Sequence, residues 1–374
     1  MEPRERLLGT FRCEKVDRPP YLCEFGPWYE TLLRWAGEGM TPVWNWQDGL
    51  GLDPPVEKLA VELGFCPAFE EAVLEDRGDR VLRRNRHGVV EEQMKATSSV
   101  AHPVDFPLKT REDWLRLKRE RLDPEDPRRF PADFDARAAK AVSEGRATRI
   151  GKYPFGLFGT LREWMGVEGF LFACADEPEW IEEMMSDLTD LWTALYRKAA
   201  QRVRIDWVHI WEDMSGRTGS LISPAMVERF MVPNYRRIRE TVDAIGATAF
   251  SVDTDGDVGE LLPRFLDAGV NFVFPFEAGC GEDIVATARR YPGLCMMGGI
   301  DKSRLAHGRA AIDAELARVD ALFDRPGYIP MLDHGIPPDV SLSDFHYYMR
   351  RLRERMGVPH PVPRHPADRP LPFG

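Results

Sequence analysis

Three aspartates within five residues, Asp253, Asp255 and Asp257, interrupt an apolar run in the segment AFSVDTDGDVGELL (249–262). Residues two apart in a strand point to the same side, so Asp253 and Asp255 are predicted to lie together and Asp257 to cap the following helix. Two carboxylates that close repel each other unless water, a cation or a shared proton relieves the repulsion. The spacing therefore indicates a site that can bind water, a cation or a proton.

Acidic side chains follow nearly every predicted strand, with aromatic side chains between them. In a barrel of parallel strands, the groups that do chemistry come from the carboxyl ends of the strands and the loops behind them. The catalytic candidates selected in this way are Asp255, His334, Glu212, Asp213 and Glu277. The substrate-binding candidates are Glu24, Trp28, Tyr153, Phe155, Trp211 and Phe276.

Some residues of these segments have a structural interpretation that is at least as good. Asp257 and Asp301 are predicted to be cap or turn residues, because Asp is favoured there by local hydrogen bonding alone. His209 lies inside an apolar strand and is interpreted as a core histidine with satisfied hydrogen bonds. Cys280 lacks a second cysteine at metal-binding spacing. For His334, next to Asp333, a structural and a functional contact are equally open.

The elements that must position these residues are alternating strands and helices. From residue 200 onward, short β-branched and aromatic runs alternate with amphipathic segments, which predicts βα units around a parallel sheet. Seven strands are predicted: Pro20–Glu24, Thr148–Lys152, Trp207–Trp211, Ala249–Val252, Asn271–Phe274, Leu294–Met297 and Tyr328–Leu332. An eight-stranded barrel needs one more, which is expected between Lys58 and Val104. The fold class is therefore predicted to be α/β, as a (β/α)8 TIM-type barrel.

The chain before residue 135 contains segments that depart from this alternation. AVLEDRGDRVLRRNRHGVVEEQMKA (72–96) alternates charged and apolar residues across two turn signals, which predicts an antiparallel hairpin inserted near the barrel mouth. Lys109 to Phe134 reads as a charged helix and a proline-punctuated loop. A single barrel domain is predicted for residues 1–357, and a proline-rich extended tail for 358–374.

Composition excludes several classes of function. The 374 residues are 43% hydrophobic, which is ample for a large core, and the net charge of −11 disfavours nucleic acid and anionic membrane surfaces as partners. The six cysteines are scattered without CxxC pairs, and no apolar run is long enough to span a bilayer. MEPRERLLGT does not read as a leader peptide. A reduced, cytoplasmic protein is expected.

The second half of the chain carries motifs of a known superfamily. The segments SLISPAMVERFMVPNYRRI, VDTDG, LLPRFLDAGVNFVFPFE, MMGGIDKSRLAHG and GYIPMLDHGIPPDVSLSDF together resemble the uroporphyrinogen decarboxylase superfamily, and RERLLGTFRCEKVDRPP resembles its N-terminal helix. This superfamily also contains corrinoid-dependent methyltransferases. The resemblance covers Arg4 to Met356, is good from Gly151 onward, and implies the (β/α)8 barrel.

The resemblance implies two chemistries, and the segment CEFGPWY (23–29) separates them. Decarboxylases of the superfamily carry an arginine-rich RQAGR motif just after the first strand, whose arginines hold substrate carboxylates by bidentate pairing. In this sequence Glu24 stands at about that place. A carboxylate there would repel a polycarboxylate, which speaks against uroporphyrinogen as the substrate.

The methyltransferases imply a zinc site, a His-x-Cys pair with a later cysteine. Matched on Gly256, those positions are Asp253, Asp255 and His334 here, a harder ligand set that suits zinc, manganese or ferrous iron with oxygen ligands. Zinc is the first expectation for a bound divalent metal. Decarboxylases carry an aspartate before the same glycine and the last histidine without needing a metal, so both alternatives stay open.

The leading hypothesis is methyl transfer between a small oxygenated substrate and a corrinoid carried on a partner protein. Asp253, Asp255 and His334 would hold a Lewis-acidic metal, and Glu212, Asp213 or Glu277 would supply acid or base. The first alternative is decarboxylation of another substrate, with Asp255 stabilising developing positive charge. The second alternative is a barrel that binds a tetrapyrrole or another small ligand without turnover. A homodimer is left open.

Overall fold

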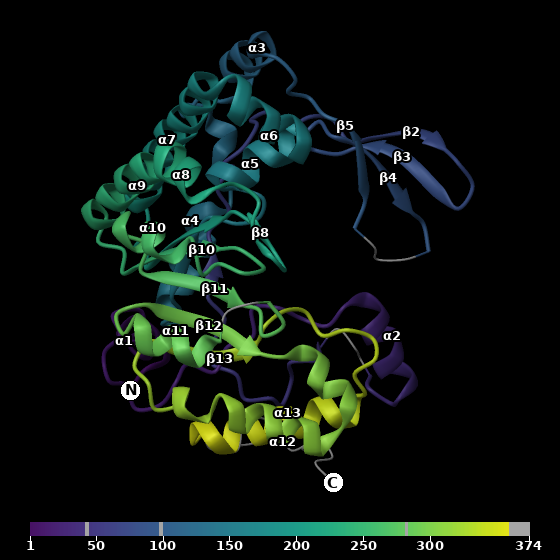
Figure 1. Ribbon diagram of the computed structural model, residues 1–374, viewed down its shortest axis with the longest axis vertical. Coiled ribbons are helices and arrows are strands. Elements are labelled where there is room, and N and C mark those ends of the chain that lie inside the picture. Colours follow the sequence, from purple (N-terminus) through teal and green to yellow (C-terminus); the bar gives the residue numbers. More distant parts are fainter. Residues whose placement is uncertain (42–44, 97–99, 281–282, 359–374) are drawn as a thin grey trace. The chain divides into compact units, whose positions relative to one another are not determined.

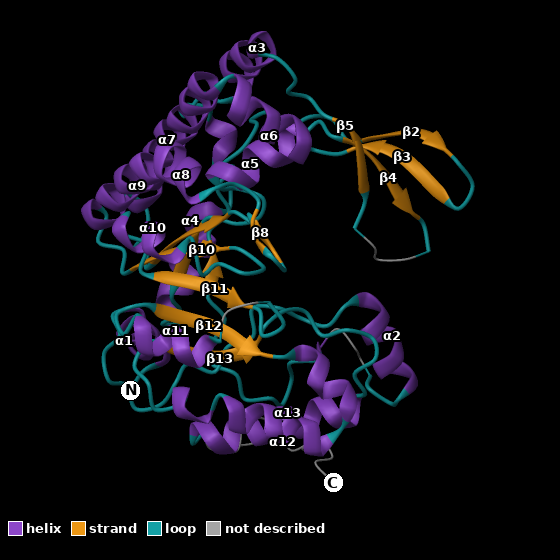
Figure 2. Cartoon of the chain, viewed as in Figure 1, coloured by secondary structure: helices purple, strands orange, loops and turns teal. Residues whose placement is uncertain are grey.

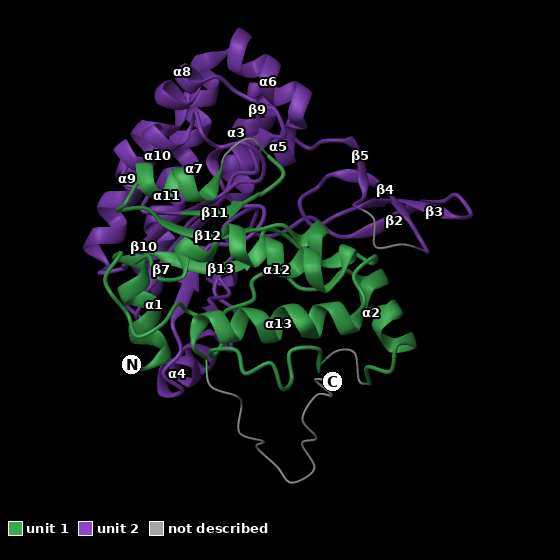
Figure 3. Cartoon of the chain, turned by 60° about the horizontal axis from the view of Figure 1, so that its bottom comes forward, with its two compact units in different colours: residues 1–55, 273–374 green, residues 56–272 purple. Residues whose placement is uncertain are grey.

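The computed structural model describes residues 1–41, 45–96, 100–280 and 283–358. The chain divides into two compact units, which Figure 3 distinguishes by colour. Unit 1 consists of Met1–Pro55 and Val273–Gly374, and unit 2 of Val56–Phe272. The predicted tail lies, from residue 359, outside the described residues.

The main sheet is parallel, which confirms the predicted α/β class; within the described residues it has seven strands, where the predicted barrel has eight (Figures 1 and 2). Its order is β1-β6-β7-β10-β11-β12-β13. The strands are β1 (Glu57–Lys58), β6 (Thr148–Ile150), β7 (Trp207–Trp211), β10 (Ala249–Asp253), β11 (Phe272–Phe276), β12 (Cys295–Ile300) and β13 (Tyr328–Leu332). Six of the predicted strands are thus confirmed to within three residues at either end.

The predicted strand Pro20–Glu24 is wrong. The segment has no strand in the structure, and the nearest pairing is an isolated parallel bridge between Pro27 and Ile336, just beyond β13. Two adjacent prolines, Pro19 and Pro20, remove two ladder donors. The backbone N–H of Tyr21 donates instead to the Asp53 carboxylate (2.9 Å). The additional strand expected between Lys58 and Val104 corresponds to the two-residue strand β1, which begins at Glu57, one residue before the expected range.

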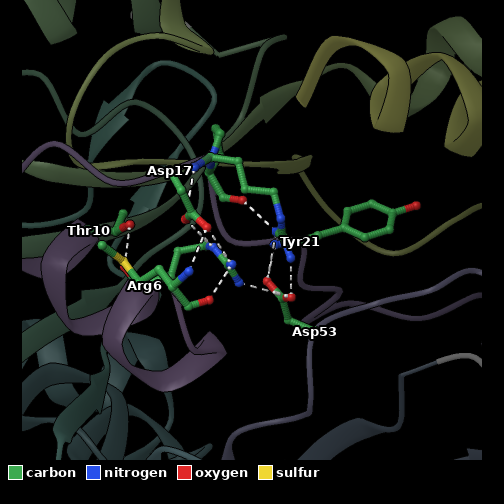
Figure 4. A network of polar contacts seen from close by, with 8 residues as sticks. Arg6, Thr10, Asp17, Tyr21 and Asp53 are labelled. Atoms are coloured by element: carbon green, nitrogen blue, oxygen red, sulfur yellow. Dashed lines mark hydrogen bonds and ion pairs between the residues drawn. The ribbon is translucent and has the colours of Figure 1, made fainter. Parts of the chain in front are cut away.

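A cluster of charged side chains holds this N-terminal segment in unit 1. Asp53, whose side chain is only 8% exposed, pairs with Arg6 (3.3 Å) and Arg18 (2.5 Å). Arg6 also pairs with Asp17 (2.8 Å), and Figure 4 shows its guanidinium directed between the two carboxylates. These bonds fix the chain between helix α1 (Pro3–Phe11) and residue 53 without any strand pairing.

Helices cover the sheet in both units. Unit 2 contains α3 (Arg111–Arg121), α4 (Phe134–Ser143), α5 (Leu157–Met165), α6 (Val167–Asp176), α7 (Pro178–Ala200), α8 (Pro224–Met226), α9 (Val232–Ala244) and α10 (Leu262–Asp267). Unit 1 contains α1, α2 (Tyr29–Gly37), α11 (Ile284–Arg290), α12 (Arg309–Arg318) and α13 (Leu342–Met356). Helix α7 begins with proline, buries a stripe that recurs every three or four residues, and packs beside α9 (Figure 1). None of the helices in the described ranges is long and apolar enough to span a membrane.

The predicted inserted hairpin is confirmed and is larger than expected. Strands β2 (Ala72–Asp76), β3 (Arg80–Arg84), β4 (Val90–Met94) and β5 (His102–Asp105) form an antiparallel sheet in that order (Figure 2). Its two tight turns contain Gly78 (φ 83°) and Gly88 (φ 84°), at the two predicted turn signals. The predicted charged helix is α3, which begins with a capping box of Thr110 and Asp113.

Candidate functional site

In unit 2, the strand register places a polar row on one face of the sheet. Lys58 pairs in register with Arg149, and Arg149 with Trp207. Ser251 pairs with His209, and Asp253 with Trp211. Because side chains alternate along a strand, these residues share a face, while Ile150, Val208, Ile210, Phe250 and Val252 form the fully buried apolar opposite face.

The polar row is connected by hydrogen bonds. The Trp207 indole N–H donates to Ser251 Oγ (2.6 Å), which lies 3.0 Å from His209 Nδ1. The other ring nitrogen of His209, Nε2, lies 3.8 Å from Asp253 Oδ2. Burial above all, and then the charges of Arg149 and Lys58, hold the pKa of His209 well below its usual range.

His209 is buried and hydrogen-bonded, as the core interpretation expected, but it also faces Asp253. Arg149, 3% exposed, was missed from the sequence. Its guanidinium lies 4.6 Å over the Trp207 ring. The available signal was a basic residue within a strand otherwise expected to be buried.

Glu212 is fully buried and closes the amino end of helix α5. Its Oε1 accepts from the backbone N–H of Leu157 (3.0 Å) and the Tyr235 hydroxyl (2.6 Å), and its Oε2 accepts from the N–H groups of Phe158 (2.7 Å) and Gly159 (3.0 Å). Burial raises the pKa of Glu212 to about 7, and the four hydrogen bonds lower it. Its contacts are those of a helix cap; the catalytic role predicted for it stays a prediction.

Asp213, whose backbone is left-handed (φ 43°), belongs to a second cluster of side chains, which is more exposed to solvent than Glu212. Its carboxylate pairs with Arg162 (2.7 Å), which lies 5.1 Å over the Trp211 ring. Tyr153, 59% exposed, meets Trp211 edge to face with ring centroids 4.5 Å apart. The predicted residues Tyr153, Trp211 and Asp213 are thus brought together at the carboxyl ends of β6 and β7.

Glu163 belongs to the same cluster and was not predicted from the sequence. Burial is the main cause that raises the pKa of Glu163. The Arg162 guanidinium lowers this pKa, and the carboxylates of Asp213 and Glu91 raise it further. The Tyr153 side chain acts on the same carboxyl group and lowers its pKa. A carboxyl group in this setting retains its proton to higher pH than an exposed one and is suited to proton donation.

The loop after β6 needs its glycines because neighbouring backbone passes very close. A Cβ on Gly151 (φ 100°) would lie 1.8 Å from the His209 carbonyl oxygen, and one on Gly156 would lie 1.9 Å from that of Trp211. Phe155 of this loop is buried, 2% exposed, against Gly64. The loop thus holds Tyr153 close to β7.

Backbone and side-chain hydrogen bonds hold the segment that contains the three aspartates. The Asp253 carbonyl accepts from the N–H of Glu212 (2.8 Å), and the Thr254 hydroxyl accepts from Met214 N–H (3.0 Å). Asp257 accepts from Gly259 N–H (3.0 Å) in a turn, whereas α10 begins only at Leu262. The predicted helix N-cap is therefore a turn residue, because the helix starts later than the polarity pattern indicated.

In unit 1, Glu277 and Asp333 flank one lysine. Lys302 Nζ lies 3.6 Å from an oxygen of each carboxylate. Asp333 is 3% exposed and accepts from the N–H groups of Ala278 (3.1 Å) and Lys302 (3.2 Å). Burial raises the pKa of Asp333, and Lys302 opposes the rise. Cys280 Sγ lies 3.4 Å from Glu277, and Asp301 caps a short helix as predicted, accepting from Ser303 N–H (2.8 Å).

The other predicted residues of unit 1 lie along the segment before α2. His334 stacks on Phe25 with ring centroids 4.9 Å apart and an interplanar angle of 12°. Trp28 is 47% exposed, with its indole against Gly335, whereas Phe276 is 3% exposed. Glu24 is half-buried, and its backbone N–H contacts Met331 Sδ (3.2 Å). The expectation that these residues line one substrate pocket together with residues of unit 2 stays a prediction.

The proposed metal ligands are divided between the units. Asp253 and Asp255 belong to unit 2, and His334 to unit 1. Within the ranges that the structure describes, no group of three His, Cys, Asp or Glu side chains is placed to hold a metal ion. The metal site therefore stays a prediction.

Comparisons with known proteins identify the family. The family profile described as uroporphyrinogen decarboxylase (URO-D) matches residues 104–355. Curated relatives named uroporphyrinogen decarboxylase include those of Maricaulis maris (31% identity over 133 residues, 35% of this chain and 37% of the relative) and Phenylobacterium zucineum (25% over 230 residues, 60% and 62%). The chain spans between about a third and two thirds of the length of these relatives.

A solved structure described as a methyltransferase from Methanosarcina mazei has the same fold. It aligns with a TM-score of 0.61 at 14% sequence identity, over 95% of this chain and 99% of the other. At this identity the likeness concerns the fold alone. Because the family profile matches more than half of the chain, this protein belongs to the uroporphyrinogen decarboxylase (URO-D) family of enzymes.

Proposed function

We propose that this URO-D family enzyme transfers a methyl group between a small oxygenated substrate and a corrinoid carried on a partner protein. The observation that carries the proposal is the absence of a carboxylate clamp after residue 20. The sequence contains no arginine, lysine or histidine from Pro19 to Leu33. A substrate with many carboxylates would meet Glu24 there, and no cation.

The arginines that flank this segment are engaged elsewhere. Arg18 makes two hydrogen bonds to the Asp53 carboxylate (3.0 and 2.5 Å). Arg34 pairs with Glu38 (2.7 Å) and donates to the Pro338 carbonyl (3.0 Å). A bidentate pair with a substrate carboxylate would require breaking these bonds. Their geometry supports a substrate other than uroporphyrinogen.

The residues of the unit 2 cluster suit cleavage of a methyl–oxygen bond. Tyr153 and Trp211 offer aromatic surfaces to a small substrate, and Glu163 can give a proton to the oxygen that loses its methyl group. Glu212, Asp213 and Glu277 remain the acid and base candidates from the sequence. When bound, the corrinoid supplies the nucleophilic centre that accepts the methyl group.

Decarboxylation of a different substrate is the second candidate, because the curated relatives carry the name uroporphyrinogen decarboxylase. In that reaction Asp255 would stabilise positive charge on the protonated substrate. The methyltransferase title of the Methanosarcina mazei structure supports the first candidate only as a property of a protein with the same fold.

The test compares both reactions in one preparation. Anaerobic protein is incubated with reduced cobalamin and, separately, methanol, methoxybenzenes and methoxyphenols, and cobalamin methylation is followed by absorbance. A parallel incubation with uroporphyrinogen is analysed for coproporphyrinogen. We expect methylation from at least one oxygenated donor, loss of that activity in Asp255→Ala, and retention in the control Asp257→Ala. Coproporphyrinogen formation, or no methylation from the whole panel, would contradict the proposal.

A further inference from the structure

The turn between β3 and β4 places His87 against the loop that follows β6. The Asn85 side chain fixes this turn, because its Oδ1 accepts from the backbone N–H groups of His87 (2.9 Å) and Val89 (3.1 Å). The His87 imidazole then meets the Phe155 ring edge to face, with ring centroids 6.0 Å apart. The inserted sheet thus adds a histidine to the loop at the carboxyl end of β6.

Lys152 of this loop lies over the same ring and has no counter-ion. Its Nζ is 6.0 Å from the centroid of the Phe155 ring. The residue is half-buried, and among the residues that the structure describes no carboxylate forms an ion pair with it. By contrast, Lys118 and Lys198 of the same unit each pair with a carboxylate at 2.6 Å. A partly buried charge is costly unless it is paired, so the ammonium group of Lys152 is suited to bind an anion.

The carboxylates in the electrostatic range of His87 are engaged by arginines. Burial is the main cause that lowers the pKa of His87. The charged side chains that also act on this pKa are those of Arg86, Glu62, Lys152 and Glu91. Glu62 pairs with Arg86, and Glu91 pairs with Arg83 (2.7 Å). Because these two pairs are neutral overall, one positive charge, that of Lys152, stays uncompensated within this group.

We propose that Lys152 and His87 together bind one carboxylate group of a small substrate. A carboxylate has two oxygens, of which one can pair with the ammonium group while the other accepts a hydrogen bond from the imidazole. The imidazole has an N–H to donate in either protonation state, so the arrangement does not depend on its charge. A phosphate with two negative charges would keep one of them uncompensated, and a neutral group would leave Lys152 unpaired.

The assignment of this carboxylate to the methyl donor rests on the function proposed above. Tyr153, the next residue in the chain after Lys152, is exposed and meets Trp211 edge to face, and both offer aromatic surface to the rest of the ligand. The substrate class is then a small monocarboxylate that carries a methoxyl group. Lys152 acts in binding and selectivity, and takes no part in breaking the methyl–oxygen bond.

The site is tested by calorimetric binding of benzoate and its neutral isostere benzamide at pH 8. The wild type should bind benzoate about tenfold more tightly, since a hydrogen bond to a charged group contributes about that factor. Lys152→Met should abolish this preference, Lys152→Arg should keep most of it, and His87→Leu should reduce it. The control Lys140→Met, whose side chain is 71% exposed in α4, should leave it unchanged.

Three results would overturn the carboxylate site. They are a wild-type protein that does not bind benzoate at millimolar concentration, equal affinity of the wild type for the two probes, and a preference for benzoate that persists in a folded Lys152→Met protein. A preference that is unchanged in His87→Leu would remove the histidine from the site.

The link to methyl transfer is tested separately, with 4-methoxybenzoate and anisole as donors to reduced cobalamin. We expect the wild type to use 4-methoxybenzoate in preference to anisole and Lys152→Met to lose this preference. Carboxylate-selective binding without methylation from either donor refutes only the proposed function. Methylation at equal rates from both donors refutes the carboxylate site as part of the substrate pocket and leaves the proposed function in place.

Discussion

Glu212→Gln should remove a pH dependence of stability that the wild-type protein has. The carboxylate accepts four hydrogen bonds within α5 and from Tyr235, and burial raises its pKa to about 7 from a usual value of 4.5. The folded state therefore holds a proton between these values that the unfolded state has released. Because the folded-state pKa is the higher one, stability falls as pH rises from about 4.5 to about 7 and is level above that.

The expected size of the fall follows from the same interval. At roughly 1.36 kcal/mol per pH unit, Glu212 lowers the free energy of unfolding by about 3 kcal/mol between pH 4.5 and 7, a large part of a typical domain's stability. A glutamine can turn its oxygen to Phe158 and Gly159 and its amide to Tyr235, but the Leu157 N–H then loses its acceptor, which costs about 1–3 kcal/mol at all pH values.

Urea unfolding from pH 5 to 8.5 tests this reasoning. The variant should be less stable than the wild type at pH 5, and the difference should shrink or reverse by pH 8. Glu168→Gln, at an exposed position of α6, is the control and should follow the wild-type curve. Parallel pH profiles for Glu212→Gln and the wild type would show that burial does not govern this carboxyl group.

Two other substitutions test the packing of the loop after β6 and the charged cluster around Asp53. Gly151→Ala should lower the melting temperature strongly and disturb β6 and β7, because its Cβ would lie 1.8 Å from the His209 carbonyl oxygen. The control Gly169→Ala in α6, whose Cβ would meet no atom within 4 Å, should stabilise the protein by up to about 1 kcal/mol. Equal effects of the two substitutions in calorimetry would contradict the close approach at Gly151. Asp53→Asn should lower the free energy of unfolding, measured in urea, by about 3 kcal/mol, because Arg6 and Arg18 lose a buried charged partner. The control Asp48→Asn, at an exposed position, should leave the free energy of unfolding nearly unchanged. An Asp53→Asn protein as stable as the wild type would show that the cluster does not hold the N-terminal segment.

The elements that follow from local pattern were predictable from the sequence. The six strands of the main sheet that follow β1 are short apolar runs between amphipathic segments, and the sequence placed each of them to within three residues. The hairpin turns at Gly78 and Gly88 and the cap at Asp301 depend on residues two to four apart. Pro20–Glu24 failed because its decisive partner, Asp53, is more than thirty residues away in the sequence.

The roles of single charged residues were decided by tertiary structure. Glu212 became a helix cap through amides more than fifty residues earlier, and Glu163 entered the site only because α5 places it near Tyr153. Likewise, the serine that hydrogen-bonds to His209 comes from the neighbouring strand. Sequence periodicity specifies which residues form an element and which face they occupy. Hydrogen bonding, burial and the resulting pKa depend on atoms brought together from distant segments, so only the folded chain determines which carboxyl groups can act as acids.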